Sequence, residues 1–160
     1  MEKRIIYLLP FIGFLFIQVE NVYAKDDSVL VPTPNLLPYE VVGIQLNALK
    51  DNNNPYENAG IEQTWEFAHP SNRKFTGPLS NFTDMMYSRS YAIMLGHLNH
   101  NIIFVNKKPN VSYFFIELID KVGNKYGFQW VVEKVIIKGE FKDCWMTTSV
   151  SQPVSLTKSV

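Results

Sequence analysis

The sequence predicts an α+β domain in which N-terminal helices pack on a curved antiparallel sheet of about four strands. Two observations lead to this fold class. Between residues 39 and 86 apolar residues recur at helical spacing, whereas residues 95–150 are rich in Val, Ile, Phe, Tyr and Trp. Short breaks made of turn residues divide this second part. Such breaks favour sequential hairpins and hence an antiparallel meander.

Residues 1–24 have the pattern of a cleavable export signal. Two basic residues precede a run from Ile5 to Ile17 in which every residue is apolar, Gly or Pro, and the segment ends at Ala24. We therefore expect signal cleavage after Ala24 and an exported protein, either periplasmic or secreted. A membrane anchor is the alternative, but this run is shorter than the roughly 20 apolar residues that cross a bilayer.

The remainder divides into a linker at residues 25–38, a single domain at residues 39–150 and a C-terminal tail at residues 151–160. Lys and Arg total 15, as do Asp and Glu, so the formal net charge is zero. This balance argues against nucleic acid or an anionic membrane as a partner, because both select a concentrated positive field. The only cysteine is Cys144, which excludes an intramolecular disulfide and a lipid-anchored N-terminus.

Three helices are predicted before the sheet. The first runs from Tyr39 to about Lys50, with Gln45 away from its apolar face, and residues 51–55 break it. The second stops near Pro70, and residues 71–79 form turns. Ser80 caps a third, short helix. The apolar faces of the three helices contain Val42, Leu46 and Leu49; then Ile61, Thr64, Trp65 and Ala68; then Phe82, Met85 and Met86.

Four strands are predicted near residues 97–105, 111–122, 126–137 and 141–150. Within the second strand, alternation places Phe114, Ile116 and Leu118 on one face and Tyr113, Phe115, Glu117 and Ile119 on the other. Both faces are largely apolar. One face can take the helices, so the other needs a partner subunit or a half-filled pocket.

The segment Gly60–Arg73, the run Thr76–Leu79, Phe82 with Met85, Tyr91 and Trp145 together resemble the domain of unknown function 4864 family. The resemblance covers residues 39–150, although His69 stands where many relatives have Ser. That family is similar in architecture to the nuclear transport factor 2-like superfamily, a cone of helices and bent sheet around a cavity. The resemblance implies this fold and a pocket but no reaction. It also adds a thylakoid lumen to the compartments considered.

Five aromatic residues are candidates for the wall of a small-molecule cavity, with ordinary core packing as the alternative for each. They are Trp65, Tyr91, Phe128, Trp130 and Trp145. Arg73 is a candidate clamp for an anionic ligand, but we expect it to hold the loop before Gly77 by bonding backbone carbonyls.

No catalytic constellation, cofactor motif or metal site is assigned. Glu117, in the middle of a strand among aromatic residues, and His97 are the candidates for acid–base chemistry, ahead of Glu62 and Asp84. The spacing of His97 and His100 places them on opposite faces of a strand, which argues against a shared metal.

The function expected from these features is that of a non-catalytic module that binds a small apolar ligand or another protein. The partner is a second copy, bound through the open sheet face, or an envelope or lumenal protein. The alternative is an acid–base enzyme that uses Glu117 or His97 in an aromatic pocket. Two sequons, at Asn81 and Asn110, matter only in a eukaryotic secretory pathway.

Overall fold

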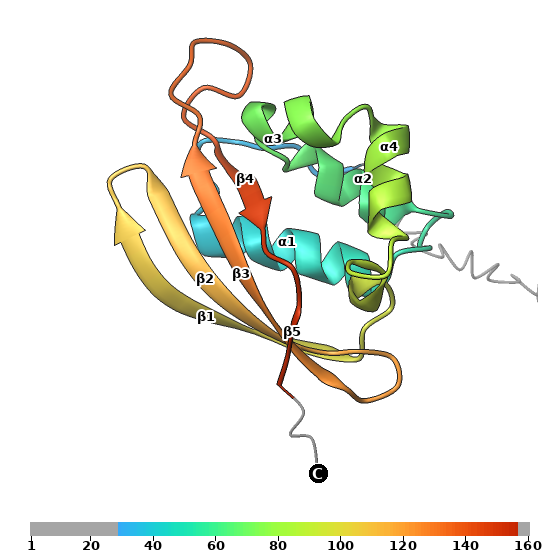
Figure 1. The fold of residues 1–160 in the computed structure, drawn as a ribbon. Coiled ribbons are helices and arrows are strands. Elements are labelled where there is room, and N and C mark those ends of the chain that lie inside the picture. The colour runs from blue at the N-terminus through green and yellow to red at the C-terminus, as the bar shows by residue number, and fades with distance from the viewer. Residues whose placement is uncertain (1–28, 157–160) are drawn as a thin grey trace, which may run out of the picture.

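The computed structural model describes residues 29–156, and Figure 1 shows their arrangement. Helices come first and strands follow along the chain. In order, the elements are α1 (Pro38–Lys50), α2 (Ala59–Glu66), α3 (Pro70–Thr76), α4 (Leu79–Met86), the 3-10 helix η1 (Ala92–Met94), β1 (Asn99–Lys108), β2 (Val111–Ile119), β3 (Lys125–Lys134), β4 (Trp145–Val150) and β5 (Val154–Ser155). The predicted α+β fold class is confirmed.

The sheet is an antiparallel meander in the order β1-β2-β3-β4, and the short β5 pairs with β3 beyond the end of β4. It curves around α1, which lies against its inner face (Figure 1). The alternation predicted for β2 is confirmed, because Phe114, Ile116 and Leu118 are all buried on this inner face. On the outer face the Phe115 ring lies against Gly127, where any larger residue would collide with it.

Helix α1 forms because its first turn is capped and one face is apolar. Pro38 occupies the first helical position, and the Glu40 carboxylate accepts a hydrogen bond from the Leu37 backbone N–H at 2.7 Å. Val42, Leu46 and Leu49 are fully buried, as their spacing predicts. The helix therefore carries the centre of the core that the sheet covers.

Helix α2 packs closely against α1 because Gly60 has no side chain. The Gly60 N–H donates to the Asn52 carbonyl at 2.9 Å, and the Asn52 side-chain oxygen accepts from the Ile61 N–H at 3.0 Å. A methyl group at Gly60 would overlap the carbonyl oxygen of Ala48 in α1. The contact between the two helices is thus a backbone-to-backbone approach.

The prediction of turns over residues 71–79 is wrong, because α3 occupies most of this segment. Pro70 starts the helix, and the His69 ring nitrogen Nδ1 accepts a hydrogen bond from the Ser71 backbone N–H at 3.1 Å. A proline is favoured at the first position of a helix as well as after the end of one. Ser80 is not the cap of the next helix, since α4 begins at Leu79 with Pro78 at the N-cap position.

The strands differ from their predicted bounds mainly at β4, which begins at Trp145 because residues 135–144 form a structured loop around Val135, Cys144 and Met146. The part of the predicted linker within the described residues is docked, since Leu30 exchanges two hydrogen bonds with the Gln63 side chain, at 2.7 and 2.8 Å. Part of the predicted C-terminal tail forms β5. The predicted export signal lies outside the described residues. Within residues 29–156, no helix has the length and apolar character to cross a membrane.

We predict opposite effects for two glycine-to-alanine substitutions. Gly60→Ala should lower the free energy of unfolding by about 2 kcal/mol or more, because the added methyl group pushes α2 away from α1. Gly43→Ala should raise it by about 0.5 to 1 kcal/mol, because a methyl there meets only Ile102 at 4.0 Å and alanine favours the helix. Urea denaturation of the two variants measures both. Equal effects would contradict the close helix contact.

Candidate functional site

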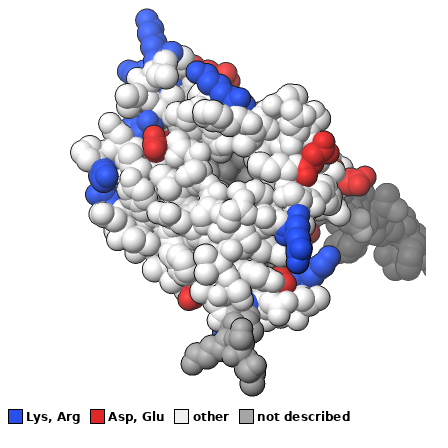
Figure 2. Space-filling model, in the orientation of Figure 1, with Lys and Arg blue, Asp and Glu red and all other residues white. Residues whose placement is uncertain are grey.

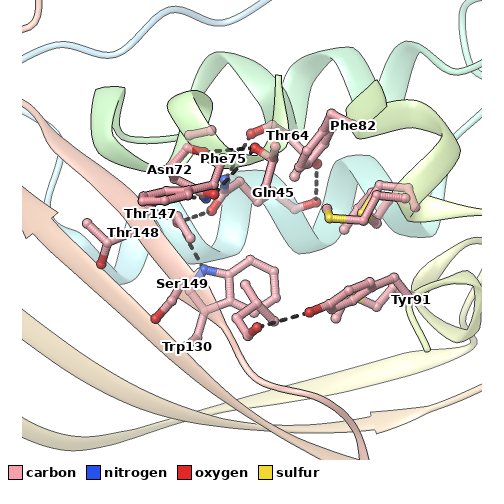
Figure 3. Close-up of a pocket in the computed structure, with 17 residues that line it drawn as sticks. Gln45, Thr64, Asn72, Phe75, Phe82, Tyr91, Trp130, Thr147, Thr148 and Ser149 are labelled. Carbon is pink, nitrogen blue, oxygen red and sulfur yellow. Dashed lines mark hydrogen bonds between the residues drawn. The ribbon is translucent and has the colours of Figure 1, made fainter. Parts of the chain in front are cut away.

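A cavity of about 250 Å³ opens between the helices and the end of the sheet that carries β4. Figure 2 shows the hollow in a face whose central surface is almost free of charged side chains. Helices α1 to α4, η1, β3 and β4 all contribute to the wall (Figure 3). The lining residues are Gln45, Leu49, Thr64, Ala68, Asn72, Phe75, Thr76, Phe82, Met85, Met86, Tyr91, Met94, Trp130, Thr147, Thr148, Ser149 and Val150.

A buried chain of hydrogen bonds crosses one wall of the cavity. The Trp130 indole N–H donates to the Thr147 hydroxyl at 3.0 Å, and this hydroxyl donates to the Gln45 side-chain oxygen at 2.6 Å (Figure 3). The Gln45 amide nitrogen in turn donates to the Thr64 carbonyl at 3.0 Å. These polar side chains therefore bond one another, and none of the described buried side-chain N or O atoms lacks a partner.

The backbone of Thr147 ties the same strand to the segment that follows α2. Its N–H donates to the Phe67 carbonyl at 2.8 Å, and its carbonyl accepts from the His69 N–H, also at 2.8 Å. Ala68 between them forms a parallel bridge with Thr147. The backbone N–H and carbonyl of Thr147 at the edge of β4 are thus both hydrogen-bonded to the segment that follows α2.

The rest of the wall carries no charge, and it combines apolar side chains with the polar side chains of Asn72, Thr76, Thr148 and Ser149. The lining residues include no Asp, Glu, Lys, Arg, His or Cys. Tyr91 is the only one with an ionisable side chain; burial raises its pKa, so it stays neutral at physiological pH. Its hydroxyl donates to the Val150 carbonyl at 3.3 Å. Phe75, at the cavity mouth, is 89% exposed.

Two of the five predicted aromatic pocket residues, Tyr91 and Trp130, line this cavity. The other three do not. Trp65 packs on Phe82 with ring centroids 5.1 Å apart, and Phe128 is buried in the core. Trp145 lies beneath the Lys134 ammonium group, 5.3 Å from its ring centroid. The sequence pattern could not separate these roles, because these five aromatic side chains are all buried or half-buried.

Arg73 acts on the backbone, as predicted, but on a different segment. Its guanidinium donates to the carbonyls of Trp65, Glu66 and Ala68 at 2.9 to 3.0 Å. These carbonyls lie at and just beyond the C-terminal end of α2, where a helix no longer supplies its regular i→i−4 hydrogen bonds. The guanidinium also lies over the rings of Trp65 and Phe141. It is therefore engaged by the protein itself.

His97 and His100 were predicted to lie on opposite faces, and this is wrong. The His97 Nε2 and His100 Nδ1 atoms are 2.7 Å apart, and His97 Nδ1 is 2.7 Å from the Met94 carbonyl. His97 precedes β1, so strand alternation does not apply to it. Burial lowers the pKa of His97 to about 4, against the hydrogen bond to Met94, and His100 and Lys50 add repulsion.

Neither His97 nor Glu117 lines the cavity. Glu117 is exposed on the outer sheet face, where it borders a separate groove of about 420 Å³ together with Asn99, His100 and Lys125. Asn101 approaches the Glu117 carboxylate at 3.5 Å. Among the described residues, no three His, Cys, Asp or Glu side chains gather as metal ligands would.

The residue that sequence reasoning misplaced is Gln45, which is 1% exposed. It was assigned to the polar side of α1, yet it lies four residues after Val41 and four before Leu49, both fully buried. Positions four apart share one face of a helix. This spacing is the signal that could have placed Gln45 at the cavity.

Comparison with known proteins leaves the ancestry open. No family model matches the chain, and neither a curated protein nor a solved structure does. The resemblance to the domain of unknown function 4864 family therefore stays a prediction.

We predict that the hydroxyl of Thr147 is a major stabilising group. Thr147→Val keeps the shape but leaves the Gln45 oxygen and the Trp130 N–H without their partner, which should cost about 2 to 4 kcal/mol. Thr147→Ser keeps the hydroxyl and serves as the matched control. Urea denaturation compares the two. A valine variant no less stable than the serine variant would rule out the hydrogen-bond chain as a stabilising element.

We also predict that acid destabilises the fold through His97. The unfolded chain takes up a proton near pH 6.5, whereas folded His97 stays neutral until about pH 4. The stabilisation is thus complete above pH 6.5 and falls by about 2 to 3 kcal/mol as the pH drops toward 4. The lowered pKa values of His69 and His100 act in the same direction.

NMR titration of the three histidine rings tests this directly, and urea denaturation at several pH values measures the energy. A His97→Gln variant keeps an acceptor for His100 and should show a weaker pH dependence. A His97 ring that titrates near pH 6.5 in the folded protein would overturn the assignment.

Proposed function

We propose that this protein is a non-catalytic binding module for a small, uncharged and largely apolar molecule. The observation that carries the proposal is the cavity of about 250 Å³ whose lining has no charged side chain. Burial of a charged ligand there would lack a compensating partner and would cost several kcal/mol. The same wall offers no acid–base pair, which favours binding over the acid–base alternative.

The polar atoms of the wall support an apolar ligand as well. Gln45, Thr147 and Trp130 bond one another, and the side chains of Asn72, Thr76 and Thr148 each donate to a backbone carbonyl. A polar ligand would therefore have to compete with existing hydrogen bonds. The methionines Met85, Met86 and Met94 add a deformable surface that adapts to ligand shape. What these groups favour is contact with a ring or a short aliphatic chain.

The size of the cavity limits the ligand. A dry protein cavity of about 150 Å³ holds benzene, so 250 Å³ corresponds to roughly ten non-hydrogen atoms, about two fused rings. A ligand of this size gains on the order of 0.7 kcal/mol per atom, about 7 kcal/mol in all, which corresponds to a Kd of about 10 µM. Export of the protein and its compartment stay predictions from residues 1–24.

A matched pair of probes tests the proposal. We expect 1-naphthol, uncharged at pH 7, to bind and to shift the indole N–H resonance of Trp130, which lies in the wall. The anion 1-naphthoate should bind at least tenfold more weakly. Trp130→Phe assigns the resonance, and calorimetry measures the two affinities.

A second test of the proposal places a charge in the wall of the cavity. Met85 is half-buried, so Met85→Glu can keep its carboxylate near solvent and leave the fold intact while it repels an apolar ligand. We expect at least a tenfold weaker affinity for 1-naphthol, and little change in Met85→Leu. The proposal fails if 1-naphthol does not bind at millimolar concentration, or if 1-naphthoate or folded Met85→Glu binds equally well.

A further inference from the structure

Four aromatic side chains line the cavity from different elements of the fold. Phe75 belongs to α3 and Phe82 to α4, Tyr91 directly precedes η1, and Trp130 belongs to β3 (Figure 3). Within residues 29–156, no ring–ring contact joins any two of these four. A ligand in the cavity therefore meets rings from both the helices and the sheet, and these rings are not already paired with one another.

The polar ends of two of these rings are already bonded. The Trp130 indole N–H donates to the Thr147 hydroxyl, and the Tyr91 hydroxyl donates to the Val150 carbonyl. What the two side chains still offer a ligand is the face or the edge of the ring itself. An aromatic ring carries a quadrupole, so a second ring gains attraction in stacked or edge-to-face contact that a saturated group of the same size does not gain.

The methionines of the wall favour a ring as well. Met85, Met86 and Met94 line the same space as the four aromatic residues, which makes seven of the 17 lining residues aromatic or methionine. A thioether sulfur is attracted to an aromatic ring, often at the ring edge, and a saturated hydrocarbon gives it no such contact. This composition favours an aromatic ligand over an aliphatic ligand of equal size.

Phe75 differs from the other three rings because it is 89% exposed. Helix α3 has no buried residue, and the described side-chain hydrogen bonds that tie it to other elements come from Asn72 and Arg73. No ring–ring contact of residues 29–156 includes Phe75. Rotation about its side-chain bonds can therefore lay the ring across the cavity mouth while α3 stays in place. Contact with an apolar ligand removes this ring from water, which is favourable.

We propose that the ligand of this cavity is a flat aromatic compound and that the Phe75 ring closes over it. This ligand class rests on the binding function proposed above, which it narrows from small apolar molecules in general to ring systems. Phe82 and Trp130 supply contacts from the helices and the sheet, and Phe75 supplies the contact at the mouth. An aliphatic ligand of the same volume gains the burial without the ring and sulfur contacts, so it binds more weakly.

A matched pair of alcohols tests the ligand class. 1-Naphthol and its saturated analogue decahydro-1-naphthol share one carbon skeleton and are both uncharged, so the binding function alone expects both to bind. We expect calorimetry on the full chain to give 1-naphthol a Kd lower by about tenfold or more. A smaller difference overturns the ring preference and leaves the binding function standing. Failure of both alcohols to bind at millimolar concentration overturns both.

A second test removes the ring at the cavity mouth. Phe75→Leu keeps an apolar side chain, and because Phe75 is 89% exposed, urea denaturation should be unchanged. We expect about a threefold or greater loss of affinity for 1-naphthol and little change for the saturated alcohol, because only the aromatic ligand stacks on Phe75. Phe104→Leu is the matched control, since Phe104 is 58% exposed on β1 and lies outside the cavity wall. It should change neither affinity.

NMR of the native protein gives an independent reading that no variant has to fold for. Bound 1-naphthol should show nuclear Overhauser effects to the ring protons of Phe75. Their absence in the saturated complex overturns the closing of Phe75 over the ligand. An unchanged affinity of Phe75→Leu for 1-naphthol, an equal loss for both alcohols, or the same loss in Phe104→Leu overturns it too.

Discussion

The hydroxyl of Thr147 is the group on which the architecture of the cavity depends. It joins Trp130 of β3 to Gln45 of α1, while its backbone joins β4 to residues 67–69 after α2. One residue thus connects the sheet both to α1 and to the segment that follows α2. Because these bonds are buried, the loss of any one of them lowers the free energy of unfolding, and water cannot reach the site to replace it without a further loss of stability. The wall holds its shape through polar bonds rather than by filling the space with side chains.

Such a wall explains how a cavity persists in a small domain. Apolar cores normally close any space larger than a methyl group, because contacts are lost around it. Here α2 cannot move toward the sheet alone, since Gly60 already sets its backbone against α1 and Arg73 holds its last carbonyls. The space left between α4, η1 and β4 is therefore bounded by elements that are fixed elsewhere. Met85, Met86 and Met94, which can change shape, lie on its helical side.

The fold class could be predicted from the sequence because periodicity reports burial directly. The stripes on α1 and α2 and the alternation along β2 have single, physically forced interpretations. Pro70 has two interpretations, the end of one helix or the start of another. The structure shows the second, with the His69 ring bonded to the Ser71 N–H at the start of α3 and Arg73 bonded back to Ala68. The residues of the site were harder to predict from the sequence than the fold class. Tyr91 and Trp130 could be proposed from residue type, but Gln45 and Thr147 are 102 positions apart, and no local pattern links them.

The cavity and strand β1 lie at opposite margins of the sheet. The cavity takes its strand residues from β3 and β4, whereas β1 contributes no residue to the cavity. Two structural routes link β1 to the cavity wall: one runs through α1, which contacts β1, β3 and β4, and the other runs along the sheet through β2 to β3.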